Sequence, residues 1–262
     1  MTRITILGGK GYVGSHLAAY FQGQGYEVFV PERGSKKVFE NHLGFVVYAI
    51  GLTADFRTRP FDTIDAHVTT LGQVLRNSSF DSFLYLSSTR VYGRCEVADE
   101  ETELPVQPGD PSDLYNLSKL MGESLALNCG REGVRVARLS NVVGGYQPSD
   151  SFVARLLRDA KAGEIRLETS TDSQKDFIHI SDAVRMLGML ATKGTGSIYN
   201  VGGGVQISNG EWVDALREKF KCKVLVDSAA PNISFPRIKI DRFIEEFSYQ
   251  PGSAMRAVND FE

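Results

Sequence analysis

The first 25 residues run from an apolar segment through a glycine-rich loop into a helical pattern, and this order restricts the fold more than any other feature. Ile4–Leu7 predicts a strand, and Gly8, Gly11 and Gly14 follow it at intervals of three. Residues 12–24 then place apolar side chains on one helical face. Such glycines permit a tight turn, close approach of backbone N–H groups to a pyrophosphate, and close packing of helix on strand. The pattern predicts a dinucleotide site, and a tight βα turn without a ligand is the alternative.

The positive end of the following helix would face the phosphates of such a cofactor. We therefore expect the cofactor to contact the residues of this loop and the first helical turn, which are Gly8, Lys10, Gly11, Tyr12, Val13 and Gly14.

Further apolar segments alternate with helical patterns through the first two-thirds of the chain. Strands are predicted near 27–30, 45–50, 83–86, 134–139 and 198–201, and helices near 63–76 and 112–125. The strands read as continuous rather than alternating apolar runs, and residues 45–50 are apolar throughout, which is typical of a parallel sheet covered by helices on both faces. The predicted fold class is α/β, a doubly wound parallel sheet (Rossmann-like) with a small C-terminal substrate-binding cap. We expect residues 1–145 with 181–202 to form the dinucleotide-binding core, and 146–180 with 203–262 the cap, in one compact unit.

The composition argues against several classes of partner. The 262 residues carry 29 Lys+Arg against 32 Asp+Glu, a net charge of −3. This balance gives no reason to expect nucleic acid or an anionic membrane surface, and no apolar run approaches the roughly 20 residues of a membrane helix. The cysteines are scattered and odd in number, at Cys95, Cys129 and Cys222, so neither a disulfide framework nor a metal site is expected. With a first strand that starts without a signal-peptide pattern, these features favour the cytoplasm.

The residues after the second strand bear on the type of dinucleotide. Glu32 stands where a carboxylate can accept the hydroxyls of the adenosine ribose, which favours NAD. Arg33, Lys36 and Lys37 follow at once and could instead hold the 2′-phosphate of NADP, or form a solvated loop. We expect NAD, with NADP as the alternative.

Tyr115 and Lys119 are four residues apart on a predicted helix, so they share one face. An ammonium group beside a phenol favours the phenolate, and this is expected to lower the tyrosine pKa and prepare a general acid or base. Ser87 and Ser88 end the fourth strand, at the edge of a parallel sheet where ligands bind. A hydroxyl there could bind the substrate oxygen that the tyrosine protonates. The alternatives are an accidental pair on an amphipathic helix and simple strand termination.

Several motifs occur together in a fixed order. They are Gly8-x-x-Gly11-x-x-Gly14, Ser87-Ser88-Thr89-Arg90-Val91-Tyr92-Gly93, Tyr115-x-x-x-Lys119, Arg138-Leu139-Ser140-Asn141-Val142-Val143-Gly144, Asp176-Phe177-Ile178-His179-Ile180-Ser181-Asp182 and Tyr199-Asn200-Val201-Gly202-Gly203. Over about residues 3–250 the sequence resembles an extended short-chain dehydrogenase/reductase of the NAD-dependent epimerase/dehydratase family, whose members act on nucleotide sugars.

The resemblance implies a role for each matching residue. Tyr115 would exchange a proton with a sugar oxygen, usually at C4, while hydride moves between C4 and the nicotinamide. Lys119 would bind the nicotinamide ribose and tune Tyr115. The substrate would contact Ser88, Thr89, Tyr115, Asn141 and Arg237, with Arg237 a candidate for pairing with the nucleotide diphosphate. An exposed loop arginine is the alternative for Arg237.

The sequence also departs from the family pattern. Thr89 and Arg90 replace the acidic pair that sugar 4,6-dehydratases carry after the active-site hydroxyl, and Arg90 replaces the cysteine of the 3,5-epimerases. Cys95 lies out of register with that cysteine. His67 replaces the usual asparagine, and Lys175 replaces the usual arginine before Asp176-Phe177. The loss of the acidic pair at Thr89 and Arg90 disfavours dehydration.

The leading hypothesis is an NAD(P)-dependent oxidoreductase that transfers hydride at C4 of a nucleotide-linked sugar, reducing a 4-keto sugar. The short cap favours reduction because a reductase presents only one face of the sugar, whereas an epimerase must let the keto intermediate turn over. The alternatives are an NAD-dependent 4-epimerase, a reductase of flavonoid or steroid ketones, and a non-catalytic dinucleotide-binding regulator. The family resemblance also suggests a homodimer, formed through the helix near 63–77 and the helix that carries Tyr115.

Overall fold

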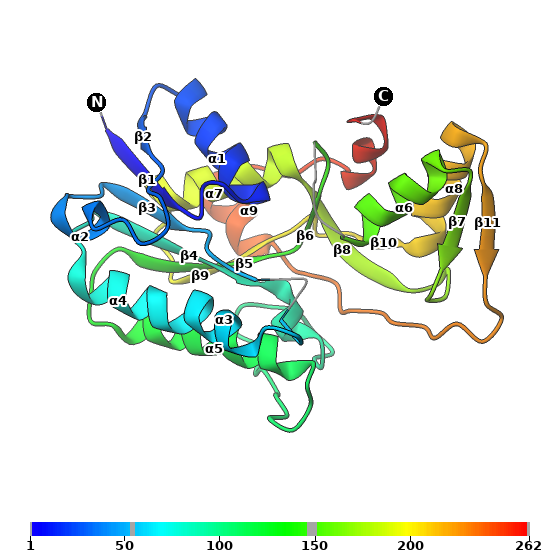
Figure 1. The fold of residues 1–262 in the computed structure, drawn as a ribbon, viewed down its shortest axis with the longest axis horizontal. Coiled ribbons are helices and arrows are strands. Elements are labelled where there is room, and N and C mark those ends of the chain that lie inside the picture. Colours follow the sequence, from blue (N-terminus) through cyan, green and yellow to red (C-terminus); the bar gives the residue numbers. More distant parts are fainter. Residues whose placement is uncertain (1, 53–55, 146–150, 261–262) are drawn as a thin grey trace.

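A six-stranded, entirely parallel sheet forms the centre of the computed structural model, which describes residues 2–52, 56–145 and 151–260 (Figure 1). The strand order is β2-β1-β3-β4-β5-β9. The strands are β1 (Arg3–Leu7), β2 (Glu27–Phe29), β3 (Phe45–Tyr48), β4 (Ser82–Ser88), β5 (Val134–Leu139) and β9 (Ile198–Val201). This order confirms the predicted doubly wound α/β fold, because the chain leaves β1 toward β2 on one side and returns through β3 toward β9 on the other.

Helices cover both faces of this sheet. One face carries α1 (Tyr12–Gly23), α7 (Ile180–Lys193) and α9 (Asp241–Phe247), which enclose the apolar cluster containing Ile4, Ile6 and Val47. The other face carries α2 (Lys37–Glu40), α4 (Thr70–Asn77) and α5 (Asp113–Asn128), around a cluster with Val46 and Tyr48. Neighbouring residues of a strand thus enter opposite cores, which explains why the apolar residues of these strands do not simply alternate with polar ones.

The helix expected near 63–76 forms in three parts. It begins with α3 (Pro60–Ile64), passes through one π-helical turn, η1 (Asp65–Thr69), and continues as α4. Proline at the first helical position suits the start of α3 because its missing N–H has no partner there in any helix. The π turn holds the buried His67, and such turns are frequent at functional sites.

The cap contains two small sheets and two helices, seen at the right of Figure 1. One sheet has the order β10-β8-β6 and the other pairs β11 with β7. Its elements are β6 (Asn141–Val143), α6 (Phe152–Lys161), β7 (Glu164–Leu167), β8 (Gln174–His179), β10 (Gln206–Ser208), α8 (Asn209–Phe220), β11 (Lys223–Val226) and the 3-10 turn η3 (Ala254–Asp260). Trp212 and Phe177 meet edge to face inside its apolar core, 5.3 Å between ring centroids.

The cap is joined tightly to the sheet. Strand β8 runs directly into helix α7, and α9, although its residues belong to the range expected in the cap, places Phe243 in the core of the main sheet. Residues 146–150, at the expected start of the cap, lie outside the described residues. Ser208 and Glu211 form the capping box at the start of α8 that their spacing predicts.

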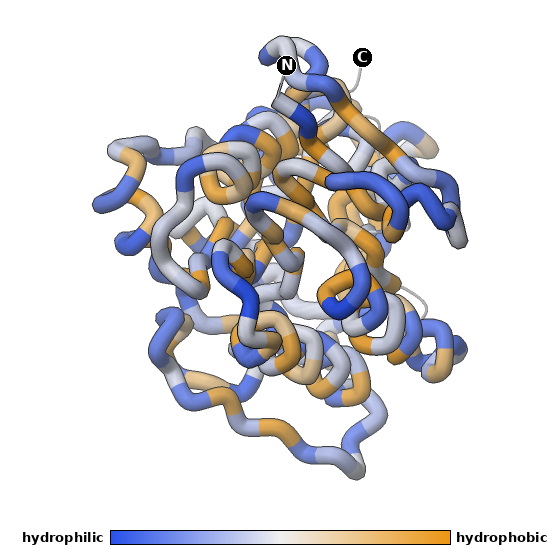
Figure 2. The backbone as a smooth tube through the Cα atoms, turned by 90° about the vertical axis from the view of Figure 1, so that its left-hand side faces the viewer, coloured by the Kyte–Doolittle hydropathy of each residue, from blue (hydrophilic) through white to orange (hydrophobic). Residues whose placement is uncertain are grey.

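Hydropathy follows the same layers. Figure 2 shows hydrophobic and hydrophilic residues alternating along the helices, with strongly hydrophilic stretches common at the periphery of the molecule. Among the described residues, no helix combines the length and the apolar character that a membrane crossing requires.

Candidate active site

The glycine loop joins β1 to α1 at the carboxyl edge of the sheet. Gly8 has φ +87°, a value that favours glycine, and a Cβ atom there would lie 2.7 Å from the backbone of Ala49. A Cβ on Gly14 would lie 2.3 Å from the carbonyl oxygen of Gly8. These contacts leave no room for side chains, so the loop backbone and the start of the helix lie close together.

The amino end of α1 is open for an anion. Gly11 is the N-cap residue and supplies no side chain to the first free N–H groups of the helix, those of Tyr12, Val13 and Gly14. A dinucleotide pyrophosphate fits this arrangement, because unpaired N–H groups and the helix dipole both favour a negative charge. The Tyr12 hydroxyl donates to the carbonyl oxygen of Gly144, 2.5 Å away, and thereby ties the first turn to the end of β6.

Lys10 and Glu32 meet at the outer side of this loop. The Lys10 ammonium lies 2.6 and 2.7 Å from the two carboxylate oxygens of Glu32, and both side chains are about three-quarters exposed. Arg33, Lys36 and Lys37 are exposed nearby. The carboxylate of Glu32, predicted to bind the ribose, and its cationic neighbours thus lie beside the glycine loop at the carboxyl edge of the sheet.

Helix α5 carries Tyr115 and Lys119 on its buried face. Tyr115 and Lys119 are each 4% exposed, and the Lys119 ammonium lies 5.9 Å from the centroid of the Tyr115 ring. Lys119 donates to the carbonyl oxygen of Leu86 in β4, 2.9 Å away. A Cβ built on Gly51, just after β3, would lie 3.5 Å from the same ammonium. Lys119 therefore lies beside the ends of β3 and β4, next to the strand that contacts the glycine loop.

Ser88 ends β4 and is the N-cap residue of η2 (Thr89–Tyr92), which is one turn of 3-10 helix. Its hydroxyl oxygen accepts from the backbone N–H of Arg90 at 3.2 Å, and its side chain lies close enough to Tyr115 to lower the pKa of that phenol. Thr89 is buried directly after it. The structure thus brings Ser88, Tyr115 and Lys119 together, as their positions in the sequence predict.

The electrostatics of the pair differ from the expectation based on spacing. Burial raises the pKa of Tyr115, and the influences that lower it are the hydrogen bond from Ser88 and the charge of Arg90. Burial also lowers the pKa of Lys119 from 10.5 to about 7, opposed by the charge of Glu123. Spacing alone could not reveal these effects, because desolvation depends on how α5 packs against the sheet.

A buried ion pair lies one helical turn beyond Lys119 on α5. Glu123, one turn further along α5, and Arg138 of β5 are each 4% exposed and make several N–O contacts, the shortest 2.8 Å. Ser87 donates to Glu123 at 2.5 Å, and Arg138 donates to the Tyr92 hydroxyl at 2.7 Å. This network fixes the ends of β4, β5 and α5 relative to one another.

His67 is the site residue whose role the sequence did not reveal. Its Nε2 accepts from the backbone N–H of Leu52 at 3.2 Å, so the proton resides on Nδ1, which lies 2.8 Å from the Ser118 hydroxyl. Ser118 in turn donates to the main-chain oxygen of Tyr115 at 2.8 Å. Burial, followed by the charge of Lys119, lowers the His67 pKa to about 2, so the ring is neutral and connects the loop after β3 to α5.

The predicted substrate residues of the cap lie on the other side of the carboxyl edge. Asn141, exposed at the start of β6, donates to the main-chain oxygen of Asp176 at 2.8 Å. The exposed Arg237 donates from Nε to the carbonyl oxygen of Gly204 at 2.8 Å. Lys175 lies between the rings of Phe152 and Phe235, 5.5 and 5.8 Å from their centroids.

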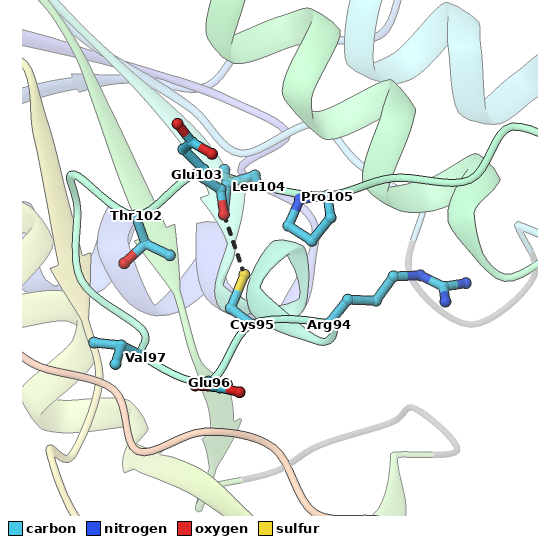
Figure 3. Close-up of a pocket in the computed structure, with 8 residues that line it drawn as sticks. All are labelled: Arg94, Cys95, Glu96, Val97, Thr102, Glu103, Leu104 and Pro105. Atoms are coloured by element: carbon cyan, nitrogen blue, oxygen red, sulfur yellow. Dashed lines mark hydrogen bonds between the residues drawn. The ribbon is translucent and has the colours of Figure 1, made fainter.

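A separate surface hollow of about 500 Å³ lies in the loop after η2 (Figure 3). Cys95 faces it and its thiol donates to the carbonyl oxygen of Glu103. Burial raises the pKa of that thiol, which does not favour a reactive thiolate. The predicted catalytic residues do not line this hollow, and the described residues contain no group of three or more metal-ligating side chains.

Comparison with known proteins gives a family match and several relatives. A sequence model described as the NAD dependent epimerase/dehydratase family matches residues 4–202. A GDP-6-deoxy-D-mannose reductase of Pseudomonas aeruginosa is 32% identical over 82% of this chain and 79% of its own length. A dTDP-glucose 4,6-dehydratase of Streptomyces griseus is 33% identical over 52% of this chain, but the match spans only 42% of that enzyme.

Solved structures resemble the whole fold. An NAD-dependent NDP-hexosamine 5,6-dehydratase, TunA, of tunicamycin biosynthesis has a TM-score of 0.84 at 22% identity, over 99% of this chain and 96% of its own. The RMD protein of Pseudomonas aeruginosa, solved with NADPH, has a TM-score of 0.81 at 23% identity, over 99% and 97%.

Proposed function

The chain belongs to the NAD dependent epimerase/dehydratase family, and we propose that it is an NAD(P)-dependent oxidoreductase that reduces a nucleotide-linked 4-keto sugar at C4. One observation carries the proposal. Tyr115, Ser88 and Lys119 meet at the same edge of the sheet as the glycine loop, because Gly8 packs on Ala49 and Gly51 packs on Lys119. The proposed proton donor and the proposed dinucleotide site therefore share one edge of the sheet.

Each side chain of the site would have a separate role in such a reaction. The bound nicotinamide would supply the hydride. Tyr115 would give its phenolic proton to the sugar oxygen as that oxygen gains charge. Ser88, whose oxygen already accepts from the Arg90 backbone N–H, would direct its own O–H toward the same oxygen. Lys119 would hold the ribose of the cofactor. The uncapped turn Tyr12–Gly14 would bind the pyrophosphate.

Two findings favour reduction over dehydration and epimerisation. Elimination of water needs an acid and a base beside the reacting carbons, and Thr89 and Arg90 occupy the positions of the acidic pair. One relative, which aligns over 82% of this chain, is a GDP-6-deoxy-D-mannose reductase. A 4-epimerase that retains its NAD is the second candidate, since it would use the same three side chains.

The cap would hold the nucleotide portion of the substrate. Asn141 and Arg237 are exposed at its border with the sheet, and Lys175 lies between two aromatic rings nearby. A guanidinium group can bind a diphosphate through two hydrogen bonds. We propose that Arg237 binds this group. Arg237→Gln should raise KM for a nucleotide sugar, whereas a flavonoid or steroid ketone reductase would show no such effect.

The choice between NAD and NADP lies with the exposed charges after β2. Glu32 would accept ribose hydroxyls, and its contact with Lys10 would have to rearrange to do so. Arg33 would pair with a 2′-phosphate. We propose NAD as the preferred cofactor, so Glu32→Ala should weaken NADH binding more than NADPH binding in a fluorescence titration.

Turnover provides the test of function. The purified protein should oxidise reduced cofactor in a one-to-one ratio with UDP-, dTDP-, GDP- or CDP-linked 4-keto sugars, and it should reduce NAD(P)+ when given GDP-6-deoxy-D-mannose if that sugar is the product. Tyr115→Phe should bind the substrate but lose most turnover, because only the proton donor is removed. Interconversion of C4 epimers without added cofactor, with NAD retained through purification, would support the epimerase instead. Cofactor binding without turnover of any such sugar would support a regulator.

We also propose that the protein forms a homodimer through α3, α4 and α5. Phe61 and Ile64 of α3 and Met121 of α5 are exposed on these helices, Phe61 by 85%. Exposed apolar side chains on neighbouring helices favour an interface. Phe61→Asp should shift the protein from dimer to monomer in size-exclusion chromatography with light scattering. A monomeric parent protein would contradict the proposal.

A further inference from the structure

Arg90 turns back into the candidate site. Its guanidinium carbon lies 5.9 Å from the centroid of the Tyr115 ring and 5.3 Å from that of Phe56. Its Nε–H is buried and has no hydrogen-bond partner in the structure. Backbone geometry keeps it there, since the 3-10 turn η2 begins at Ser88 and the Arg90 N–H is bonded to the Ser88 hydroxyl.

Arg90 also lacks a carboxylate of its own. The acidic groups whose charges act on it are Asp110 and Asp113, and both are in ion pairs with Arg94, at 2.5 and 3.0 Å. Within the part of the chain that the structure describes, no carboxylate lies at ion-pair distance from Arg90. Arg57, stacked on Phe56 at 4.5 Å, adds a second positive charge instead.

Other charged groups around Tyr115 already have partners or carry little charge. Lys119 is bonded to Leu86, and burial lowers its pKa to about 7, so it carries only part of a charge near neutral pH. The His67 ring is neutral. Glu123 is neutralised by Arg138. Among the described residues, Arg90 is therefore the cation beside the phenol that is fully charged near neutral pH and has no carboxylate partner.

We propose that Arg90 is the electrostatic partner of Tyr115 and stabilises the tyrosinate that forms when Tyr115 releases its proton. The step rests on the proposed function. As the sugar oxygen takes the proton, the O–H bond of Tyr115 breaks and its electron pair stays on the phenolate oxygen, where the positive charge of Arg90 attracts it. Arg90 acts through Tyr115 and is thus a positioning residue.

The test measures the ionisation of Tyr115 without requiring turnover. A fluorinated tyrosine, whose phenol ionises at lower pH, is incorporated at position 115 of the full chain and titrated by fluorine NMR. Arg90→Gln should raise the pKa of that phenol by about one unit, at the low end of the effect of a nearby opposite charge. Arg90→Lys should restore most of the shift. Arg57→Gln is the matched control, because it removes an arginine stacked on the same phenylalanine but not placed over Tyr115, and it should leave the phenol pKa unchanged.

The pH dependence of kcat provides an independent test of the same proposal. In the oxidation direction Tyr115 accepts the proton, so Arg90→Gln should lower kcat about tenfold at fixed pH and recover the parent rate about one pH unit higher. An unchanged phenol titration in Arg90→Gln would overturn the proposal, as would a rise in KM alone, which would instead show that Arg90 binds a substrate anion. If Arg90→Gln does not fold, the same titration and rate measurements are made on Arg90→Met, which removes the charge but keeps an alkyl side chain against Phe56. A shifted titration in a protein that turns over no nucleotide sugar would contradict the proposed function but leave the pairing of Arg90 with Tyr115 intact.

Discussion

Replacing Glu123 by glutamine should destabilise the protein far more than an ordinary surface substitution. The change keeps the shape of the side chain but leaves the guanidinium of Arg138 without its carboxylate, in a place where each side chain is 4% exposed. Removing one partner of a buried pair leaves an uncompensated charge, which typically costs about 3–5 kcal/mol. We expect the free energy of unfolding of Glu123→Gln to fall by roughly that amount.

The contacts allow the magnitude to be worked out further. Arg138 contacts Glu123 through Nε at 3.1 Å and Nη2 at 2.8 Å, while Ser87 also donates to the carboxylate. A neutral amide can still accept one of these bonds, so the loss comes chiefly from the stranded charge. In Glu123→Leu/Arg138→Met both charges are absent, and the main remaining costs are the unpaired hydroxyl of Ser87 and the carbonyl oxygen of Glu100 that loses Arg138, about 1 kcal/mol each. The Tyr92 hydroxyl keeps its hydrogen bond to Asn200. The double variant should therefore be more stable than Glu123→Leu alone.

The assay is equilibrium unfolding in urea, followed by both fluorescence and circular dichroism, for the parent, Glu123→Gln, Glu123→Leu, Arg138→Met and the Glu123→Leu/Arg138→Met double variant. Coincident transitions would justify a two-state treatment. The coupling energy from the double-mutant cycle should exceed about 2 kcal/mol. A cost below about 1 kcal/mol for Glu123→Gln, or additive single changes, would refute the view that this pair is a mutually dependent buried unit.

Three further predictions address the helix starts and the buried lysine. Burial lowers the pKa of Lys119 from 10.5 to about 7, so the unfolded chain binds this proton more tightly than the folded chain does. The free energy of unfolding should therefore rise by up to about 1.4 kcal/mol per pH unit between pH 7 and pH 10.5. In urea unfolding, Lys119→Met should not show this rise with pH. Gly14→Ala would place a methyl group 2.3 Å from the carbonyl oxygen of Gly8, so the free energy of unfolding should fall by about 1–3 kcal/mol. The variant should also lose NADH binding in a fluorescence titration. Normal NADH binding would contradict the proposed role of the loop. Ser208→Ala removes half of the capping box with Glu211 and should cost about 1 kcal/mol, while an unchanged melting temperature would show that the box adds little.

Features determined by local sequence could be predicted without the structure. The apolar runs identified all six strands of the main sheet, since burial on both faces leaves a continuous apolar signature. The glycine spacing predicted a loop in which Gly8 has positive φ and Gly14 packs on it. Four-residue spacing placed Tyr115 and Lys119 on one face of α5. In each case the information lies within a few consecutive residues.

Features created by tertiary packing could not be predicted in this way. The π turn η1 lies inside a segment whose periodicity predicts an ordinary helix, and His67 acquires its role only by contact with Leu52 and Ser118, 15 and 51 residues away. Helix α9 follows the cap in sequence but packs on the main sheet, because Phe243 finds its apolar partners there. The pKa of Lys119 depends on burial, which no local pattern specifies.

The charges at the carboxyl edge of the sheet connect these packing effects with the chemistry. An acidic side chain at position 90 could remove a proton from a sugar carbon, but it would also oppose formation of a tyrosinate beside it. Arg90 reverses both effects, because a guanidinium group cannot act as a base at neutral pH and attracts the phenolate. Burial of Lys119 weakens the charge that would otherwise serve this purpose. On the proposed function, the position of Arg90 over the Tyr115 ring would thus favour delivery of one proton to a sugar oxygen over elimination of water.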